Sequence, residues 1–90
     1  MTFEPLVSCV CVTYGRPILL GEAVKCFIDQ TYPNKELIIV NDQEGVTLRF
    51  SEDRDNIRVE NVPTRFGSLG EKRNYGMSLA NGDYICIWDY

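Results

Sequence analysis

The sequence has no histidine, and its Lys and Arg residues form no run long enough to follow a phosphate backbone. Because the net charge is also −4, we expect no nucleic-acid partner. No apolar stretch approaches the roughly 20 residues that span a bilayer, and the N-terminus shows no basic segment leading into an apolar core and a cleavage site. A cytoplasmic location is the default expectation, with a membrane-peripheral one left open for the full-length protein.

The signature motifs of several enzyme classes are missing as well. The chain has no G-x-G-x-x-G, no P-loop and no G-x-S-x-G, so dehydrogenases, P-loop NTPases and esterases lose their main support. It has no Cys-x-x-Cys pair, although it contains Cys9, Cys11, Cys26 and Cys86. We expect these cysteines to be reduced and buried as small apolar residues. A disulfide or a zinc site is the alternative.

What is present is the composition of an ordinary globular domain. Hydrophobic residues make up 44% of the chain and charged residues 24%, which excludes disorder. The 90 residues suffice for one small domain and not for two. We therefore treat residues 1–90 as a single partial domain.

Short apolar runs predict the strands. Leu6–Val12, Leu37–Val40 and Tyr84–Trp88 lack polar alternation, as strands do when a parallel sheet is covered on both faces. Ile57–Val62 alternates apolar and polar residues and predicts an edge strand. The polar segment Gln43–Asn56 is expected to be a surface loop.

Two segments carry helix signals. Pro17 suits a first helical turn, and apolar residues then recur at three- and four-residue spacing until Tyr32–Asn34 turns the chain. Ser68 and Glu71 match a capping box for a helix that ends near Leu79, with Gly82 as a left-handed stop. The order is β-α-β-β-α-β, which predicts an α/β fold with a mostly parallel sheet covered by helices, Rossmann-like in outline.

Polar residues follow the strands at the edge where such sheets bind ligands. The first strand ends at Thr13, Tyr14, Gly15 and Arg16, the second at Asp42 and the last at Asp89. Asp42 could accept a hydrogen bond from a base or a ribose, or it could simply cap a turn. The aromatic rings of Tyr14, Tyr84 and Trp88 could stack on a ligand or belong to the core.

Charged residues suggest where a diphosphate and a metal could bind. Lys72 and Arg73 lie near the start of the second helix, where the helix dipole is positive, so they could hold a phosphate or form a solvated charged face. Asp89 could help to bind Mg²⁺ or Mn²⁺. One carboxylate does not make a metal site.

Six short stretches, in a fixed order, span essentially the whole chain: Val12–Pro17, Gln30–Pro33, Val40–Glu44, Lys72–Gly76, Asn81–Ile85 and Trp88–Tyr90. In the order and spacing of these stretches, the chain resembles the family-two glycosyltransferases, which have the GT-A fold. Those enzymes show a P-T-Y-N-R-like turn, a Q-T-Y-P helix end, a V-D-D-G-S strand end, an A-R-N-x-G helix and a G-x-Y-I strand before D-x-D.

The resemblance implies a role for several of these residues. Thr13 and Tyr14 would contact the nucleotide base, and Tyr14 would stack on it. Asp42 would hydrogen-bond the base, usually uracil, and Arg73 would lie near the phosphates. Asp89 matches the first Asp of D-x-D. Together with Arg16 and Lys72, these residues make up the expected nucleotide- and metal-binding set.

The chain also departs from the family pattern. Gly15 replaces Asn, Asn41 replaces the first Asp of V-D-D, and Gln43 and Glu44 replace Gly-Ser, which leaves the ribose contacts and the choice of base open. The second Asp of D-x-D would follow Tyr90, and the acceptor-binding half and catalytic base are expected beyond it. No catalytic residue is therefore assigned in this chain.

The expected function is transfer of a sugar from a nucleotide-diphosphate sugar, most simply a UDP-sugar, to an acceptor hydroxyl of a glycan, lipid or protein. The resemblance implies a hexosyltransferase-type enzyme that uses Mn²⁺ or Mg²⁺ and transfers the sugar by direct displacement, with inversion of configuration. The alternative is a nucleotide-binding or protein-interaction module without transfer chemistry. The 90-residue chain alone is expected to be inactive, and to self-associate through an open sheet edge.

Overall fold

A computed structural model describes residues 4–49 and 54–90 of the chain. The elements are β1 (Val7–Thr13), α1 (Pro17–Asp29), β2 (Lys35–Asn41), β3 (Ile57–Asn61), α2 (Leu69–Ser78) and β4 (Tyr84–Ile87). This order confirms the predicted β-α-β-β-α-β arrangement. Residues 50–53 of the predicted loop Gln43–Asn56 lie outside the described residues.

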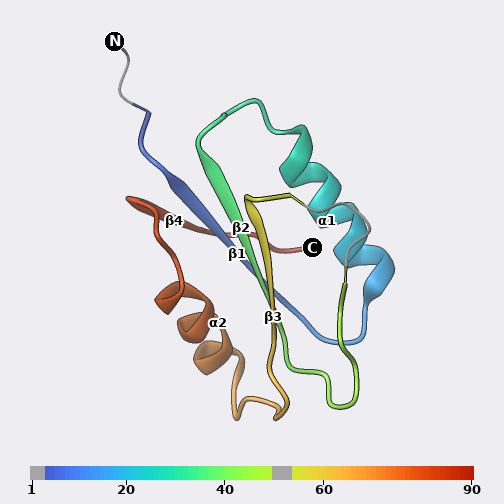
Figure 1. The fold of residues 1–90 in the computed structure, drawn as a ribbon. Coiled ribbons are helices and arrows are strands. Elements are labelled where there is room, and N and C mark those ends of the chain that lie inside the picture. The colour runs from blue at the N-terminus through green and yellow to red at the C-terminus, as the bar shows by residue number, and fades with distance from the viewer. Residues whose placement is uncertain (1–3, 50–53) are drawn as a thin grey trace.

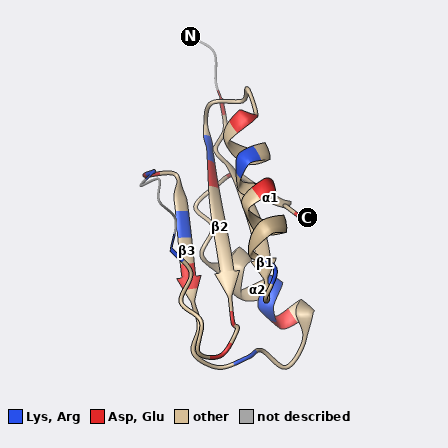
Figure 2. Cartoon of the chain, turned by 90° about the vertical axis from the view of Figure 1, so that its right-hand side faces the viewer, with Lys and Arg blue, Asp and Glu red and all other residues tan. Residues whose placement is uncertain are grey.

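The four strands form one sheet in the order β3-β2-β1-β4 (Figure 1). Every neighbouring pair is parallel, and Thr13 at the end of β1 lies in register with Asn41 at the end of β2. The two helices lie on opposite sides of the sheet, α1 to the right and α2 to the left in Figure 1. The α/β class and the edge position of β3, which carries both Arg58 and Glu60, are therefore confirmed (Figure 2).

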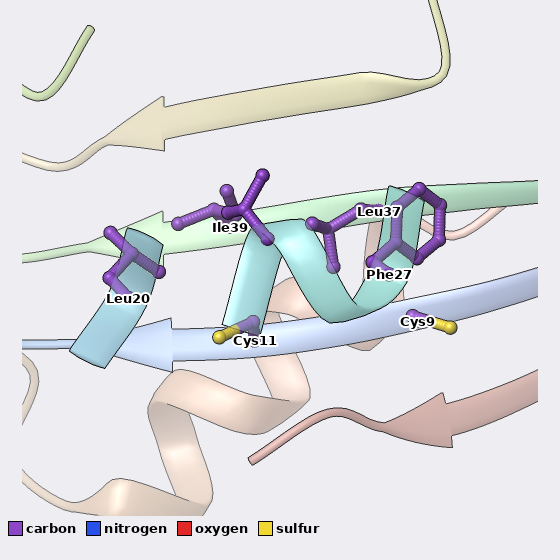
Figure 3. Packing of buried hydrophobic residues seen from close by; sticks show 7 residues of the cluster. Cys9, Cys11, Leu20, Phe27, Leu37 and Ile39 are labelled. Carbon is purple, nitrogen blue, oxygen red and sulfur yellow. The ribbon is translucent and has the colours of Figure 1, made fainter. Parts of the chain in front are cut away.

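The main core lies between α1 and the sheet. Alternate residues of β1 and β2 point toward the helix because side chains of a strand alternate between its faces. Cys9, Cys11, Leu37 and Ile39 thus meet the apolar stripe of α1, which includes Phe27 (Figure 3). Leu20, Ala23 and Val24 from the same predicted stripe are also buried.

Trp88 closes one end of this core. Its ring meets that of Phe27 edge to face, with 6.2 Å between the ring centroids. Its indole Nε1 donates a hydrogen bond to the Ala23 carbonyl oxygen at 2.9 Å. Of the two roles open to Trp88 from the sequence, the structure supports the core role.

On the other face, a glycine lets α2 approach the sheet closely. A Cβ atom on Gly76 would lie 2.5 Å from Cγ1 of Val10 and 3.2 Å from Cγ2 of Val40. The predicted helix cap is confirmed, because Ser68 Oγ accepts a hydrogen bond from the Glu71 backbone N–H at 3.1 Å. The close approach fixes where the first turns of α2 meet the ends of β1 and β2.

The prediction that the last strand is covered on both faces is wrong. β4 is an edge strand, and Tyr84, Ile85 and Ile87 are exposed by 65%, 47% and 39%. The expectation of buried cysteines holds for Cys9 and Cys11 and fails for Cys26 and Cys86, which are exposed, although all four are free thiols. Burial raises the pKa of Cys9 to about 11 and that of Cys11 to about 12.

Gly82 does not provide the left-handed helix stop that its position in the sequence predicts. Among the described residues, only Gly15 and Gly45 have a positive φ, and α2 ends through Leu79 at φ −89°. Gly82 is needed for another reason. A Cβ atom there would lie 2.7 Å from the Leu6 carbonyl oxygen and 2.9 Å from the Ser8 nitrogen.

Hydrogen bonds hold this close approach together at the amino ends of the strands. The Gly82 N–H donates to Ser8 Oγ at 2.8 Å, and Ser8 Oγ donates to Glu36 Oε2 at 2.5 Å. The Asn81 N–H donates to the same carboxylate oxygen at 2.8 Å. Burial raises the pKa of Glu36, but these hydrogen bonds outweigh it and leave the pKa below its usual value.

None of the helices in residues 4–49 and 54–90 is both long enough and apolar enough to cross a membrane.

We predict that Gly82→Ala lowers the free energy of unfolding by about 1–3 kcal/mol, because the new methyl group meets backbone atoms that cannot rotate away. Urea denaturation checks this. Gly21→Ala is the matched control. Gly21 lies in α1, and apart from its own helix no atom lies within 4 Å of the place its new methyl group would take, so alanine should be neutral or stabilise by up to about 1 kcal/mol. Equal effects of the two substitutions would contradict the close-approach explanation.

Candidate functional site

The carboxyl ends of the strands meet the start of α2 at one edge of the sheet. Thr13 ends β1, Asp42 directly follows β2, and Asp89 comes shortly after β4. Parallel strands bring these positions together, and open α/β sheets bind their ligands at this edge. The turn after β1 begins with Tyr14 and continues through Gly15, whose φ of +66° favours glycine.

Of the cavities that the described residues form at this edge, two share part of their lining. The larger, of about 530 Å³, is lined by Thr13, Arg16, Arg73 and Asp89 among others. The smaller, of about 330 Å³, is lined by Asp42 and the loop before α2. The two cavities share four lining residues: Tyr14, Arg65, Leu69 and Lys72. Every residue of the predicted nucleotide- and metal-binding set therefore lines at least one cavity.

A buried ion pair joins the chain segments that line the two cavities. Asp42 is 2% exposed and Lys72 5%. The Lys72 ammonium donates one hydrogen bond to Asp42 Oδ1 and another, of 2.6 Å, to the Thr13 carbonyl oxygen. The Phe66 N–H donates to Asp42 Oδ2 at 2.8 Å. This cluster joins β1, β2, α2 and the loop before α2.

The ion pair excludes one of the two roles considered for Lys72. Lys72 is not part of a solvated face, and its charge compensates the Asp42 carboxylate. Burial raises the pKa of Asp42, but the hydrogen bonds from Lys72 and Phe66 outweigh it and hold the pKa below the usual value. Asp42 stays ionised at neutral pH, and each of its oxygens can accept a further hydrogen bond.

Tyr14 presents an aromatic ring to both cavities. The residue is 40% exposed, and the Arg65 guanidinium carbon lies 4.3 Å from the ring centroid. The Lys72 ammonium lies 5.8 Å from the same centroid. Sequence reasoning missed Arg65, because it sits in an irregular loop outside the matched motifs. Its one signal was a position shortly before a capped helix.

Arg73 and Asp89 form a long contact in the lining of the larger cavity. Arg73 Nη2 lies 3.5 Å from Asp89 Oδ1, and the Asp89 side chain is 66% exposed. Arg73 Nε is buried and has no hydrogen-bond partner among the described residues. A buried donor without a partner costs free energy, so the protein satisfies the Arg73 guanidinium less completely than it satisfies the Lys72 ammonium.

Asp89 does not form a metal site with the other residues that the structure describes. No group of three or more His, Cys, Asp or Glu side chains gathers in residues 4–49 and 54–90. Asp89 has a guanidinium as its neighbour rather than a second carboxylate. Hard divalent cations need several oxygen ligands, and among the described residues Asp89 is the only carboxylate that lines the larger cavity.

Thr13 and Arg16 complete the edge. The Thr13 hydroxyl shares a hydrogen bond of 2.9 Å with the Tyr90 hydroxyl. Arg16 is exposed and immediately precedes α1, and its side chain makes no capping hydrogen bond. The larger cavity is thus lined by Arg16, Arg65, Lys72 and Arg73 with Asp89 as its carboxylate. A chain of net charge −4 concentrates positive charge here.

A parallel sheet between two helices, with polar residues gathered at its carboxyl edge, defines an α/β protein of the Rossmann-like class. The chain belongs to glycosyltransferase family 2, since the family model described as "Glycosyl transferase family 2" matches residues 8–90. The motif resemblance found in the sequence is thereby confirmed.

Individual relatives agree with the family assignment. The chain is 32% identical over 89 residues to a glycosyltransferase of Rickettsia typhi, RT0329, covering 93% of this chain and 26% of the relative. It is 33% identical over 90 residues to the glycosyltransferase GlyG of Streptococcus pneumoniae, covering 93% and 29%. It is 28% identical over 96 residues to the probable glycosyltransferase YdaM of Bacillus subtilis, covering 94% and 22%. The chain thus spans less than a third of these relatives.

We predict that Lys72→Met lowers the free energy of unfolding at pH 7 by about 3–5 kcal/mol, because it leaves the Asp42 carboxylate buried without its partner. The loss relative to wild type should shrink near pH 3. There the wild type loses the stabilisation that the lowered Asp42 pKa provides, while protonation relieves the variant. Denaturant titrations at the two pH values check this.

The matched control is Lys25→Met on the exposed side of α1, which should change stability by less than about 0.5 kcal/mol. A Lys72→Met loss no larger than that of Lys25→Met would show that the buried pair does not organise the edge.

Proposed function

We propose that this chain is the nucleotide-binding part of a glycosyltransferase that moves a sugar from a nucleotide-diphosphate sugar to an acceptor hydroxyl. The observation that carries the proposal is that all seven predicted residues line the two cavities at the carboxyl edge: Thr13, Tyr14, Arg16, Asp42, Lys72, Arg73 and Asp89. The family assignment supports the reaction class.

The cavities offer different chemistry to the two ends of such a donor. Asp42 can accept a hydrogen bond from a base N–H, and Tyr14 offers an aromatic face beside it. Arg16 and Arg73 line the larger cavity, where they favour the diphosphate. We therefore propose base binding in the smaller cavity and diphosphate binding in the larger one, with a UDP-sugar as the simplest donor.

Further features of the reaction rest on the family alone. We propose a hexosyltransferase-type, inverting enzyme located in the cytoplasm, with Mn²⁺ or Mg²⁺ accompanying the diphosphate and Asp89 as the one ligand from this chain. The catalytic base and acceptor site belong to sequence outside these residues, so the 90-residue chain should be inactive. Sugar transfer by the chain alone would contradict that expectation.

We predict that UDP binds the chain saturably and that Arg73→Gln weakens the binding about tenfold or more, because a charged hydrogen-bond donor to the diphosphate is lost. Calorimetric titration with UDP and separately GDP, each with and without Mg²⁺, checks this and identifies the base. Arg73→Gln is preferable to a change at Asp42, whose loss would leave Lys72 buried and unpaired.

The matched control is Arg58→Gln. Arg58 lies on β3, pairs with Glu60 and lines neither cavity, so its loss should leave UDP binding unchanged. Equal weakening of UDP binding by both substitutions would show that the loss comes from the change in net charge and not from a contact in the cavity. Absence of binding to either nucleotide would remove the support for nucleotide recognition by this chain.

We also propose that the 90-residue chain self-associates through the open edge of β4, whose residues Tyr84, Ile85, Cys86 and Ile87 are exposed and uncharged. Unpaired strand edges bind other strands. Sedimentation velocity at rising concentration should show oligomers, which Ile85→Lys reduces. Ile18→Lys, at an exposed apolar position on α1, is the matched control and should not reduce them. A wild type that stays monomeric would refute the proposal.

A further inference from the structure

Arg65 stands at the boundary between the two cavities. It lines both of them, as does Tyr14, and its guanidinium carbon lies 4.3 Å from the Tyr14 ring centroid. This stack therefore lies where the Asp42 side of the edge meets the Arg73 and Asp89 side. A ligand that carries a base at one end and a diphosphate at the other must pass this stack to fill both cavities.

The Arg65 side chain is held loosely, but its backbone is fixed. The side chain is exposed, and within the described residues no carboxylate forms an ion pair with it. The next residue, Phe66, is anchored through its N–H to Asp42 and through its ring to Tyr75, with 5.4 Å between the ring centroids. Displacement or substitution of the Arg65 side chain should therefore leave the backbone of the loop in place.

A guanidinium and a nucleobase compete for the same surface. Both are flat and both stack on aromatic faces. Tyr14 is an exposed residue, and the Arg65 guanidinium lies over its ring, so the guanidinium occupies ring surface on which a base could stack. Leaving the ring gives up a single exposed cation–π contact, which is weak.

We propose that Arg65 is a gate of the nucleotide site, and the proposal rests on the nucleotide-binding function above. In the free chain its guanidinium covers Tyr14 and divides the site. An entering base takes its place on the ring, which joins the two cavities. The displaced guanidinium then lies beside the larger cavity, where it donates hydrogen bonds to the diphosphate.

The gate has opposite effects on two related ligands, which makes it testable. Uridine needs the Tyr14 ring and has no phosphate, so Arg65→Ala should raise its affinity about two- to fivefold, the equivalent of one exposed cation–π contact. UDP gains the same access and loses a cation. The ratio of UDP to uridine affinity should therefore fall about tenfold or more in the variant.

NMR titrations of the wild-type chain, Arg65→Ala and the control Arg58→Ala with uridine and with UDP measure these ratios. In the wild type, ring-current shifts of the Arg65 side-chain protons report the Tyr14 contact directly, and saturating UDP should abolish them. Arg58→Ala should match the wild type for both ligands, because Arg58 lines neither cavity.

The outcomes distinguish a failure of the Arg65 gate from a failure of the proposed nucleotide binding. If UDP binds the wild type but Arg65→Ala leaves uridine affinity unchanged or lower, or if the Arg65 shifts persist in saturating UDP, the gate is wrong and the nucleotide site stands. If neither ligand binds the wild type, the proposed nucleotide-binding function is wrong, and the gate, which rests on it, is wrong as well.

Discussion

The buried pair of Asp42 and Lys72 is the contact on which the rest of the site depends. Two charges inside a small domain persist only when they meet each other and further hydrogen-bonding groups. Here the ammonium also binds the Thr13 carbonyl, and the carboxylate also binds the Phe66 N–H. Four separate pieces of chain thus converge on one pair. The main apolar core lies on the α1 side of the sheet, whereas this pair joins the strand ends to α2 on the other side.

The sequence predicted the elements well because their signals are local. Apolar runs located β1 and β2, and Ser68 marked the start of α2. It failed where a residue's surroundings come from distant chain. Lys72 looked like a helix-start cation, but its burial depends on Asp42, thirty positions away. Gly82 looked like a helix stop, but the Leu6 and Ser8 backbone explains it. Arg65 belongs to no periodic pattern, so only the fold could place it against Tyr14.

Glycines set the spacing on which this edge relies. Gly76 brings α2 close to Val10 and Val40, and Gly82 brings the start of β4 close to β1. Both act by leaving room, and neither has a positive φ. If the Gly76 contact were wider, Lys72 and Arg73 on α2 would move away from the ends of β1 and β2. Interiors packed at crystal-like density transmit such shifts rather than absorb them. The same spacing that stabilises the fold therefore also fixes the distances within the site.

The positive charges at this edge differ in how firmly they are compensated. The firmly paired Lys72 stabilises the fold, whereas the loosely paired arginines are suited to binding. Lys72 is neutralised by a buried carboxylate at hydrogen-bond range. Among the described residues, Arg73 has only a long contact with an exposed Asp89 and keeps a buried Nε without a partner, and Arg65 rests on an aromatic ring. Loosely paired cations repel one another and lie near the positive end of α2. An anion that enters the larger cavity relieves both costs at once, whereas the Asp42–Lys72 pair gains little from it. Binding energy is thus available from the arginines, while the buried pair can stay unchanged and hold the fold.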